Sequence, residues 1–171
     1  MRGEERRPDF EPELKLGIPA YIPDAYVPDE NERLVLYRRF GRANTEQDLF
    51  DLRDEIRDRV GPVPTLVENL VAAMNLRRRM KAQMILTAIV KGTQLEVRFH
   101  PDAPVEPAKL VALAKENRRT MKLTPSYQVI ARIEPGEYPQ VFAQVDGILQ
   151  ALVTCEKLEH PMTSVAGPII N

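Results

Sequence analysis

The sequence has few of the residues on which most catalytic and metal sites are built. It contains one cysteine, Cys155, and two histidines, His100 and His160, which lie far apart and each precede a proline. A lone cysteine excludes an internal disulfide and fits a reducing, cytoplasmic location. Because neither histidine has a cysteine or histidine at ligand spacing, we expect no metal site. Cys155 follows an apolar helical pattern, so we interpret it as a buried structural thiol rather than a nucleophile.

Excess charge and long apolar runs are also missing. Lys and Arg total 24 against 25 Asp and Glu in 171 residues, which gives a net charge of −1. This balance argues against a surface coated with cations for nucleic-acid binding, although it leaves room for local patches. No run approaches the roughly 18 apolar residues of a membrane span, and the charged N-terminus does not resemble a signal peptide. The motifs GxxxxGK[ST], GxGxxG and GxSxG are absent, so we expect neither a cofactor nor catalysis from this chain.

What the sequence does contain is a proline-punctuated arm from Pro12 to Asp29. Its four prolines each fix φ and remove a backbone hydrogen-bond donor. Between them lie the apolar residues Leu14, Leu16, Ile18, Tyr21, Ile22, Tyr26 and Val27. A disordered linker would not carry so many apolar side chains. We therefore expect the arm to lie across a folded body with these side chains buried.

Hydrophobic periodicity predicts three helices followed by strands with interspersed helices. The predicted helices span about 30–40, 46–60, 65–81, 107–117 and 138–158, and the predicted strands 85–91, 94–99, 120–123 and 127–133. Thr45 is a predicted N-cap with Asp48 in the capping-box position. The order predicts an α+β fold, in which a helical N-terminal half packs with a small, mainly antiparallel sheet and a long C-terminal helix. We divide the chain into a tail (1–11), one domain (12–158) and a second tail (159–171).

The predicted second helix carries acidic residues along one side. They are Asp51, Asp54, Glu55 and Asp58, at positions i, i+3, i+4 and i+7. The opposite, apolar side consists of Leu49, Leu52, Ile56 and Val60. One interpretation is a solvated face whose charge is offset by the neighbouring arginines at 53, 57 and 59. The other is a docking surface for a basic partner, where electrostatic complementarity sets register and association rate.

A second candidate surface is the basic end of the predicted third helix. It consists of Arg77, Arg78, Arg79 and Lys81. As phosphate contacts, these residues would favour nucleic acid. Cations at a helix C-terminus also complement the helix dipole, and no aromatic residues are interleaved with them. The near-neutral net charge favours this structural explanation.

Three long segments resemble the C-terminal domain of bacterial transcription-repair coupling factors. They read LGIPAYIPDAYVPDENERLVLYRRF, DLRDEIRDRVGPVPTLVENLVAAMNLR and VEPAKLVALAKENRRTMKLTPSYQVIARI, within a resemblance that covers about residues 10–158. The parent proteins of that family are multidomain, ATP-driven DNA translocases. They displace RNA polymerase stalled at DNA damage and recruit excision repair through UvrA. The resemblance therefore implies a non-catalytic regulatory domain, because the nucleotide-binding motifs of the motor are not in this sequence.

The resemblance also implies a partner within the same polypeptide. In the family, the C-terminal domain packs on an N-terminal module that resembles UvrB and masks its UvrA-binding surface, as an autoinhibitory clamp. We therefore expect the four acidic residues to face basic residues of that module, with Glu55 and Asp58 as the first choice. The docked and released states should differ by only a few kcal/mol, so that the clamp can open. The alternative is a nucleic-acid-binding accessory domain that uses Arg77 to Lys81.

Overall fold

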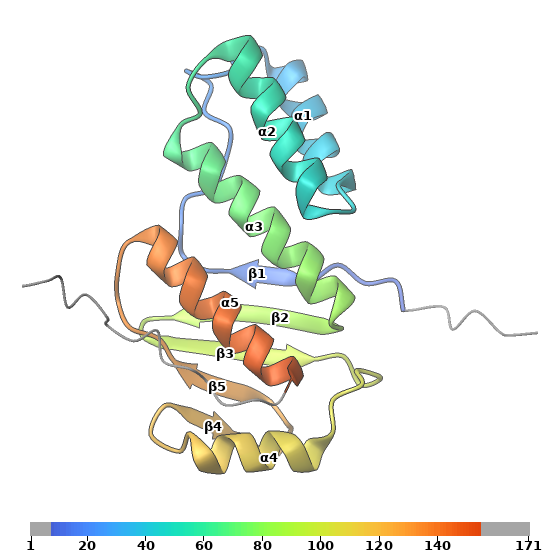
Figure 1. Ribbon diagram of the computed structural model, residues 1–171, viewed down its shortest axis with the longest axis vertical. Coiled ribbons are helices and arrows are strands. Elements are labelled where there is room, and N and C mark those ends of the chain that lie inside the picture. Colours follow the sequence, from blue (N-terminus) through green and yellow to red (C-terminus); the bar gives the residue numbers. More distant parts are fainter. Residues whose placement is uncertain (1–7, 155–171) are drawn as a thin grey trace, which may run out of the picture.

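The computed structural model describes residues 8–154 and confirms the α+β architecture (Figure 1). The helices are α1 (Glu30–Arg42), α2 (Glu46–Val60), α3 (Thr65–Ala82), α4 (Pro107–Glu116) and α5 (Tyr138–Thr154). The strands are β1 (Glu13–Lys15), β2 (Ile85–Lys91), β3 (Gln94–Phe99), β4 (Met121–Leu123) and β5 (Val129–Arg132). Cys155, the predicted helix end at Leu158 and the tail over 159–171 lie outside the described residues.

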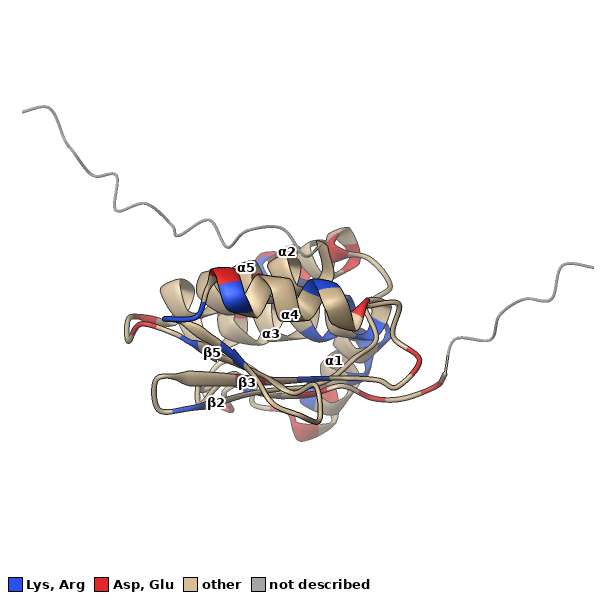
Figure 2. Cartoon of the chain, turned by 90° about the horizontal axis from the view of Figure 1, so that it is seen from below, with Lys and Arg blue, Asp and Glu red and all other residues tan. Residues whose placement is uncertain are grey.

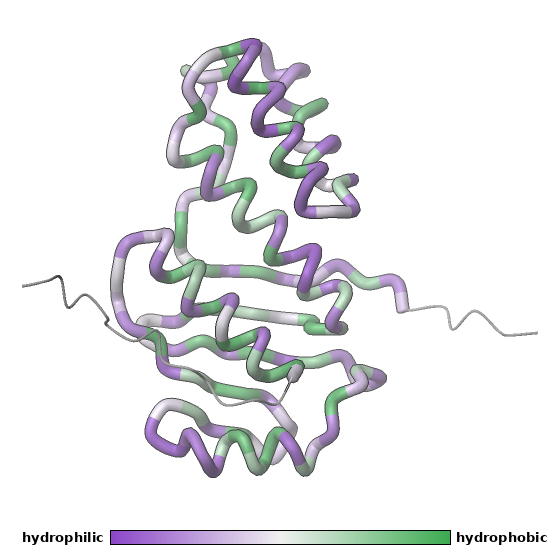
Figure 3. The backbone as a smooth tube through the Cα atoms, viewed as in Figure 1, coloured by the Kyte–Doolittle hydropathy of each residue, from purple (hydrophilic) through white to green (hydrophobic). Residues whose placement is uncertain are grey.

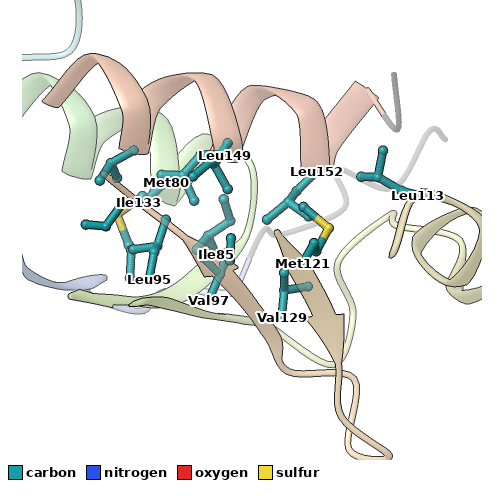
Figure 4. Close-up of a cluster of buried hydrophobic side chains, with 14 of the residues drawn as sticks. Met80, Ile85, Leu95, Val97, Leu113, Met121, Val129, Ile133, Leu149 and Leu152 are labelled. Atoms are coloured by element: carbon teal, nitrogen blue, oxygen red, sulfur yellow. The ribbon is translucent and has the colours of Figure 1, made fainter. Parts of the chain in front are cut away.

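The strands form one mixed sheet in the order β1-β2-β3-β5-β4. Only β1 runs parallel to its neighbour, β2, and the other pairs are antiparallel. Helices α3, α4 and α5 lie on one side of this sheet (Figure 2). On that side, Leu149 and Leu152 of α5 cover Leu95 and Val97 of β3 and Val129 of β5 in one buried cluster (Figure 4). The sheet and its helices therefore form a two-layer unit with a core of its own.

A second core lies in the helical half of the molecule. Phe40 of α1 packs with Leu49 and Ile56 of α2 and with Val67 of α3. Helix α3 contributes to both cores, because Met80, near its C-terminal end, belongs to the sheet core. Thus α3 connects two hydrophobic clusters that are otherwise built from different elements.

The arm crosses both cores, much as the sequence predicts. Its first part forms β1, where Leu14 pairs with Ala88 of β2, and its later residues Ile22 and Val27 are buried in the helical core. The side-chain amide of Asn69 in α3 donates to the Pro19 carbonyl at 2.9 Å and holds the arm in place. The expectation that every apolar arm residue is buried is wrong for Tyr21, which is 49% exposed. The backbone of this residue is held in place, because the Tyr21 N–H donates to the Leu66 carbonyl at 3.2 Å, while its ring is half-exposed to solvent.

The predicted capping box at the start of α2 is confirmed. The Asp48 N–H donates to the Thr45 hydroxyl oxygen at 3.1 Å, and the Thr45 N–H donates to the Asp48 carboxylate at 2.9 Å. Gly61, with a φ of 116°, follows the last turn. The prediction that Val60 belongs to the buried face is wrong, since Val60 is 41% exposed. It is the last helical residue, where the chain turns away at Gly61.

Helix α1 is covered on one side only. Its apolar residues surround much of the helix, yet only Leu36 and Phe40 are buried. Leu34 and Val35 are 47% and 50% exposed. Within residues 8–154, α1 packs against α2 and α3, and no element covers its outer face. The helix also continues through Gly41, two residues past its predicted end.

Candidate protein-binding surface on helix α2

The acidic residues of α2 lie on the side of the helix that faces away from its core. Leu49, Leu52 and Ile56 are buried, and the four acidic residues occupy the opposite side, as their spacing predicts. Hydrophilic and hydrophobic segments alternate along α1 and α2 in Figure 3. We define the acidic strip as the residues Asp51, Asp54, Glu55 and Asp58.

Glu55 is the member of the acidic strip that is bound most firmly within the chain. Arg39 of α1 donates to both of its carboxylate oxygens, from Nη1 at 2.7 Å and from Nη2 at 2.6 Å. Arg59 lies 3.9 Å from the same carboxylate. The hydrogen bonds from Arg39 hold the pKa of Glu55 below its ordinary value. Glu55 therefore joins α2 to α1, and its negative charge is already balanced.

Asp54 is balanced as well. Its Oδ1 lies 2.9 Å from a guanidinium nitrogen of Arg53 and 3.1 Å from one of Arg57. Arg53 also stacks over the ring of Phe50, with 5.0 Å between its guanidinium carbon and the ring centroid. For Asp54 and Glu55, these contacts fit the interpretation of a surface whose charge is offset by neighbouring arginines.

The charges of Asp51 and Asp58 are the least compensated of the strip. Asp51 is exposed and accepts a hydrogen bond from the neutral amide of Gln47 at 2.8 Å. The side chain of Asp58 is 75% exposed and lies 3.6 Å from Nε of Arg57. Because an exposed ion pair contributes little in water, both carboxylates are available to an incoming cation. The structure thus divides the strip into an inner pair, whose carboxylates are balanced by arginines, and an outer pair that faces solvent.

The strip rests on a firm support, because α1 and α2 are joined by a second ion pair. Glu32 of α1 contacts Arg59 of α2 at 2.7 Å, in addition to the pair between Arg39 and Glu55. The two pairs lie about two turns apart along α1 and about one turn apart along α2. They fix the orientation of the two helices, so a partner that binds the outer carboxylates would meet a preformed surface.

The basic end of α3 has partners within the chain. Arg77 lies 3.7 Å from Glu11, and Lys81 lies 2.9 Å from Glu11 and 3.5 Å from Asp9. Glu11 raises the pKa of Lys81 by its hydrogen bond. Sequence reasoning missed these contacts, since residues 9 and 11 fall in the predicted tail and carry no local signal of pairing.

The other two arginines at the C-terminal end of α3 contact different residues. Arg78 donates to the side-chain oxygen of Asn75 at 2.9 Å. Arg79 contacts Asp146 of α5 at 2.5 Å and donates to the Gln150 side chain at 3.1 Å. The four cations therefore do not converge on one point, and three of them face carboxylates. This arrangement reduces the positive charge that they could offer to phosphate.

No other described feature resembles a reaction centre. A hollow of about 630 Å³ lies between the segment over 8–12 and the ends of α1 and α3, and its charged lining residues include Asp9, Glu11, Arg77 and Lys81, which pair with one another. In the part of the chain that the structure describes, His, Cys, Asp and Glu form no group of three or more suited to a metal. None of the helices within residues 8–154 is long and apolar enough to cross a membrane.

Comparison with known proteins gives consistent results at the level of sequence. The model of the TRCF domain family matches residues 16–110, more than half of the 171 residues. The transcription-repair-coupling factor of Myxococcus xanthus is 33% identical over 156 residues, which are 91% of this chain and 13% of that protein. The Escherichia coli (strain K12) protein of the same name is 32% identical over 113 residues, which are 65% of this chain and 10% of its own length. The chain thus matches only about an eighth of the length of the Myxococcus protein and about a tenth of the Escherichia coli protein.

A solved structure supports the fold. It is a crystal structure of the C-terminal domain of transcription-repair coupling factor, with a TM-score of 0.65 and 17% sequence identity. The match covers 85% of this chain and 96% of that one. The resemblance seen in the sequence, the match of the family model and the shared fold lead to one conclusion: this chain belongs to the TRCF domain family.

Proposed function

We propose that this TRCF domain is the regulatory, non-catalytic part of a transcription-repair coupling factor. On this proposal, it docks reversibly on a UvrB-like module of the same polypeptide and masks the surface that binds UvrA. The larger protein would be an ATP-driven DNA translocase that displaces stalled RNA polymerase in nucleotide-excision repair. Family membership supports the general role, and the acidic strip of α2 is the observation that carries the docking part.

The division of the acidic strip suggests which residues make the contact. Asp51 and Asp58 face solvent and can pair with cations of the module without breaking a contact inside the domain. Glu55, named first from the sequence together with Asp58, would take part as a pair with Arg39 rather than as a free carboxylate. We therefore assign the outer pair the electrostatic contact and Glu55 the task of holding α1 beside it.

The neighbouring face of α1 adds an apolar component. Val35 lies one turn before Arg39 on the same side of α1, and it is 50% exposed next to a surface that is otherwise charged. Leu34 beside it is 47% exposed. A modest apolar contact ringed by charge is typical of an interface that must open again, whereas a permanent interface is larger and more hydrophobic.

Calorimetric titration of the chain into the separately expressed UvrB-like module of its own parent protein would test the proposal. We expect saturable binding that weakens from low to physiological salt, because exposed charges are screened. An Asp51→Lys, Asp58→Lys variant should lose this binding while its unfolding curve stays unchanged. The matched control is Asp102→Lys, Glu116→Lys, which makes the same change of charge in the sheet half and should bind normally.

Two results would contradict the proposal. One is undiminished binding by the Asp51→Lys, Asp58→Lys variant. The other is equal loss of binding by the control, which would indicate a general effect of net charge rather than a surface on α2. Because a covalent connection raises the effective concentration of a partner, the same two variants should also be compared in the intact parent protein. There, only the α2 variant should increase binding of UvrA.

A further inference from the structure

A second basic segment differs from the end of α3 in having no acidic partners in the part of the chain that the structure describes. It lies where α4 ends and β4 begins, and its cations are Lys115, Arg118, Arg119 and Lys122. All four are exposed. Within residues 8–154, none of them has a carboxylate within ion-pair distance. Glu116 is the one acidic residue between positions 115 and 122.

The helix dipole accounts for only one of these cations. Lys115 lies in the last turn of α4, where a positive charge is favourable. Arg118 and Arg119 lie beyond the helix end, in the turn, and Lys122 lies in β4. Since the influence of the dipole falls off beyond the last turn, the local fold gives no reason for three further unpaired cations.

The turn that carries these cations is held in one conformation by hydrogen bonds. The Asn117 side chain donates to the Leu113 carbonyl at 2.9 Å, and the Thr120 N–H donates to the Asn117 carbonyl at 2.8 Å. The Arg132 N–H of the neighbouring strand β5 donates to the Thr120 carbonyl at 2.6 Å. The cations are therefore displayed on a preorganised loop, which lowers the entropy cost of binding through it.

The surroundings of the turn favour a polyanion over a protein as the partner. Protein interfaces have a buried apolar centre, as the outer face of α1 could provide with Leu34 and Val35. In the turn, by contrast, Met121 is buried in the sheet core, and no exposed apolar side chain accompanies the cations. Figure 2 views the molecule from the end at which α4 lies.

From these observations we infer that the turn between α4 and β4 binds the phosphate backbone of a nucleic acid. We expect the contact to be electrostatic and independent of base sequence, as contacts to phosphate are. This surface lies in the sheet half, at the opposite end of the molecule from the acidic strip (Figure 1). The inference does not depend on the proposed docking, and either can fail without the other.

Fluorescence anisotropy of a short, labelled DNA duplex of mixed sequence, titrated with the 171-residue chain, tests this inference. The titration is repeated between about 50 and 200 mM salt, and the slope of log Kobs against log salt counts the phosphates engaged. We expect binding at low salt, and an Arg118→Gln, Arg119→Gln variant should reduce the magnitude of the slope by about 2. The matched control is Arg38→Gln, Arg42→Gln, which removes two exposed arginines of α1 and should leave the slope unchanged.

Three outcomes would overturn the inference. The first is absence of binding at the lowest salt. The second is an equal reduction of the slope by both variants, which would indicate a general charge effect. The third is tighter binding of the turn to polyglutamate than to the duplex, lost in the Arg118→Gln, Arg119→Gln variant, which would assign the turn to an acidic protein. Circular dichroism of each variant keeps a folding defect from being read as lost binding.

Discussion

The two halves of this molecule differ in how much they depend on ion pairs. In the helical half, Arg39 and Glu55 join α1 to α2, and Glu32 and Arg59 do the same two turns earlier along α1 and one turn later along α2. In the sheet half, backbone ladders and apolar packing join most elements, and Arg79 of α3 also pairs with Asp146 of α5. Within residues 8–154, the cations of the turn after α4 stay unpaired. In the helical half, the ion pairs occupy Glu55 of the acidic strip and leave Asp51 and Asp58 for a partner. In the sheet half, the exposed cations after α4 are available to bind.

The two hydrophobic cores also differ, in size and in how they are completed. The sheet core is continuous from β2 to β4 and is closed by α5 (Figure 4). The helical core is smaller and depends on the arm, whose Ile22 and Val27 complete it. We therefore expect the helical half to open more readily than the sheet half, and the predictions below test that difference from the largest effect to the smallest.

The largest effect should come from a cavity in the helical core. Phe40 is 2% exposed, so Phe40→Ala should destabilise the chain by about 3–5 kcal/mol. In native-state hydrogen exchange, the amides of α1 and α2 should lose protection while those of β3 keep it. Leu149→Ala, in the sheet core, should expose β3 amides instead. Equal loss of protection in both halves in each variant would show that the two cores unfold as one.

The next effect concerns the arm. Asn69→Ala removes the hydrogen bond to the Pro19 carbonyl. Because Asn69 is only 5% exposed, the free energy of unfolding in urea should fall by about 1–2 kcal/mol. Asn31→Ala, at an exposed position of α1, is the control and should change stability by less than about 0.5 kcal/mol. A similar effect of the two substitutions would mean that the arm does not depend on Asn69.

The start of α2 should be more tolerant. Thr45→Ala removes the side-chain half of the capping box and should cost about 1 kcal/mol, whereas Thr45→Ser should be nearly neutral because its hydroxyl keeps the bond to the Asp48 N–H. Thermal unfolding of the two variants side by side measures this. An alanine variant as stable as the serine variant would show that tertiary contacts alone set the start of α2.

The smallest effect is that of the pair between Arg39 and Glu55, and it should depend on pH. The pKa of Glu55 is lowered in the folded chain, so the stabilisation is present above its ordinary value of 4.5 and is lost as the pH falls through the folded value. At pH 7, Glu55→Gln should be less stable by about 0.5 kcal/mol, since the pair is partly exposed. This difference should vanish in acid, and a difference that stays constant from neutral to acidic pH would contradict the assignment.

Local signals in the sequence were sufficient for much of the fold. The capping box at Thr45, the end of α2 at Val60 and the adjacent strands β2 and β3 all depend on residues a few positions apart, and all are present. The order of elements follows from the change of hydrophobic period. The strand β1 was not predicted, because its three residues are too short for a periodic signal and its parallel partner lies in β2, far along the chain.

The candidate sites were harder to predict because long-range pairing decides which charges are available. The spacing of the acidic strip is visible in the sequence, but the contact that occupies Glu55 comes from Arg39, 16 residues away. The contact between Lys81 and Glu11 spans 70 residues. A run of cations therefore looks the same in the sequence whether it is neutralised, as at the end of α3, or free, as after α4.

The sharing of α3 between two cores has a consequence for how the domain could work. An 18-residue helix is about 27 Å long, and this one is anchored at each end in a different hydrophobic cluster. It acts as a strut that fixes the separation and the angle between the α2 surface and the turn after α4. Two macromolecules that bound at these places would be held at a set distance and orientation. The domain would then act as a rigid spacer between them, in addition to docking on the module.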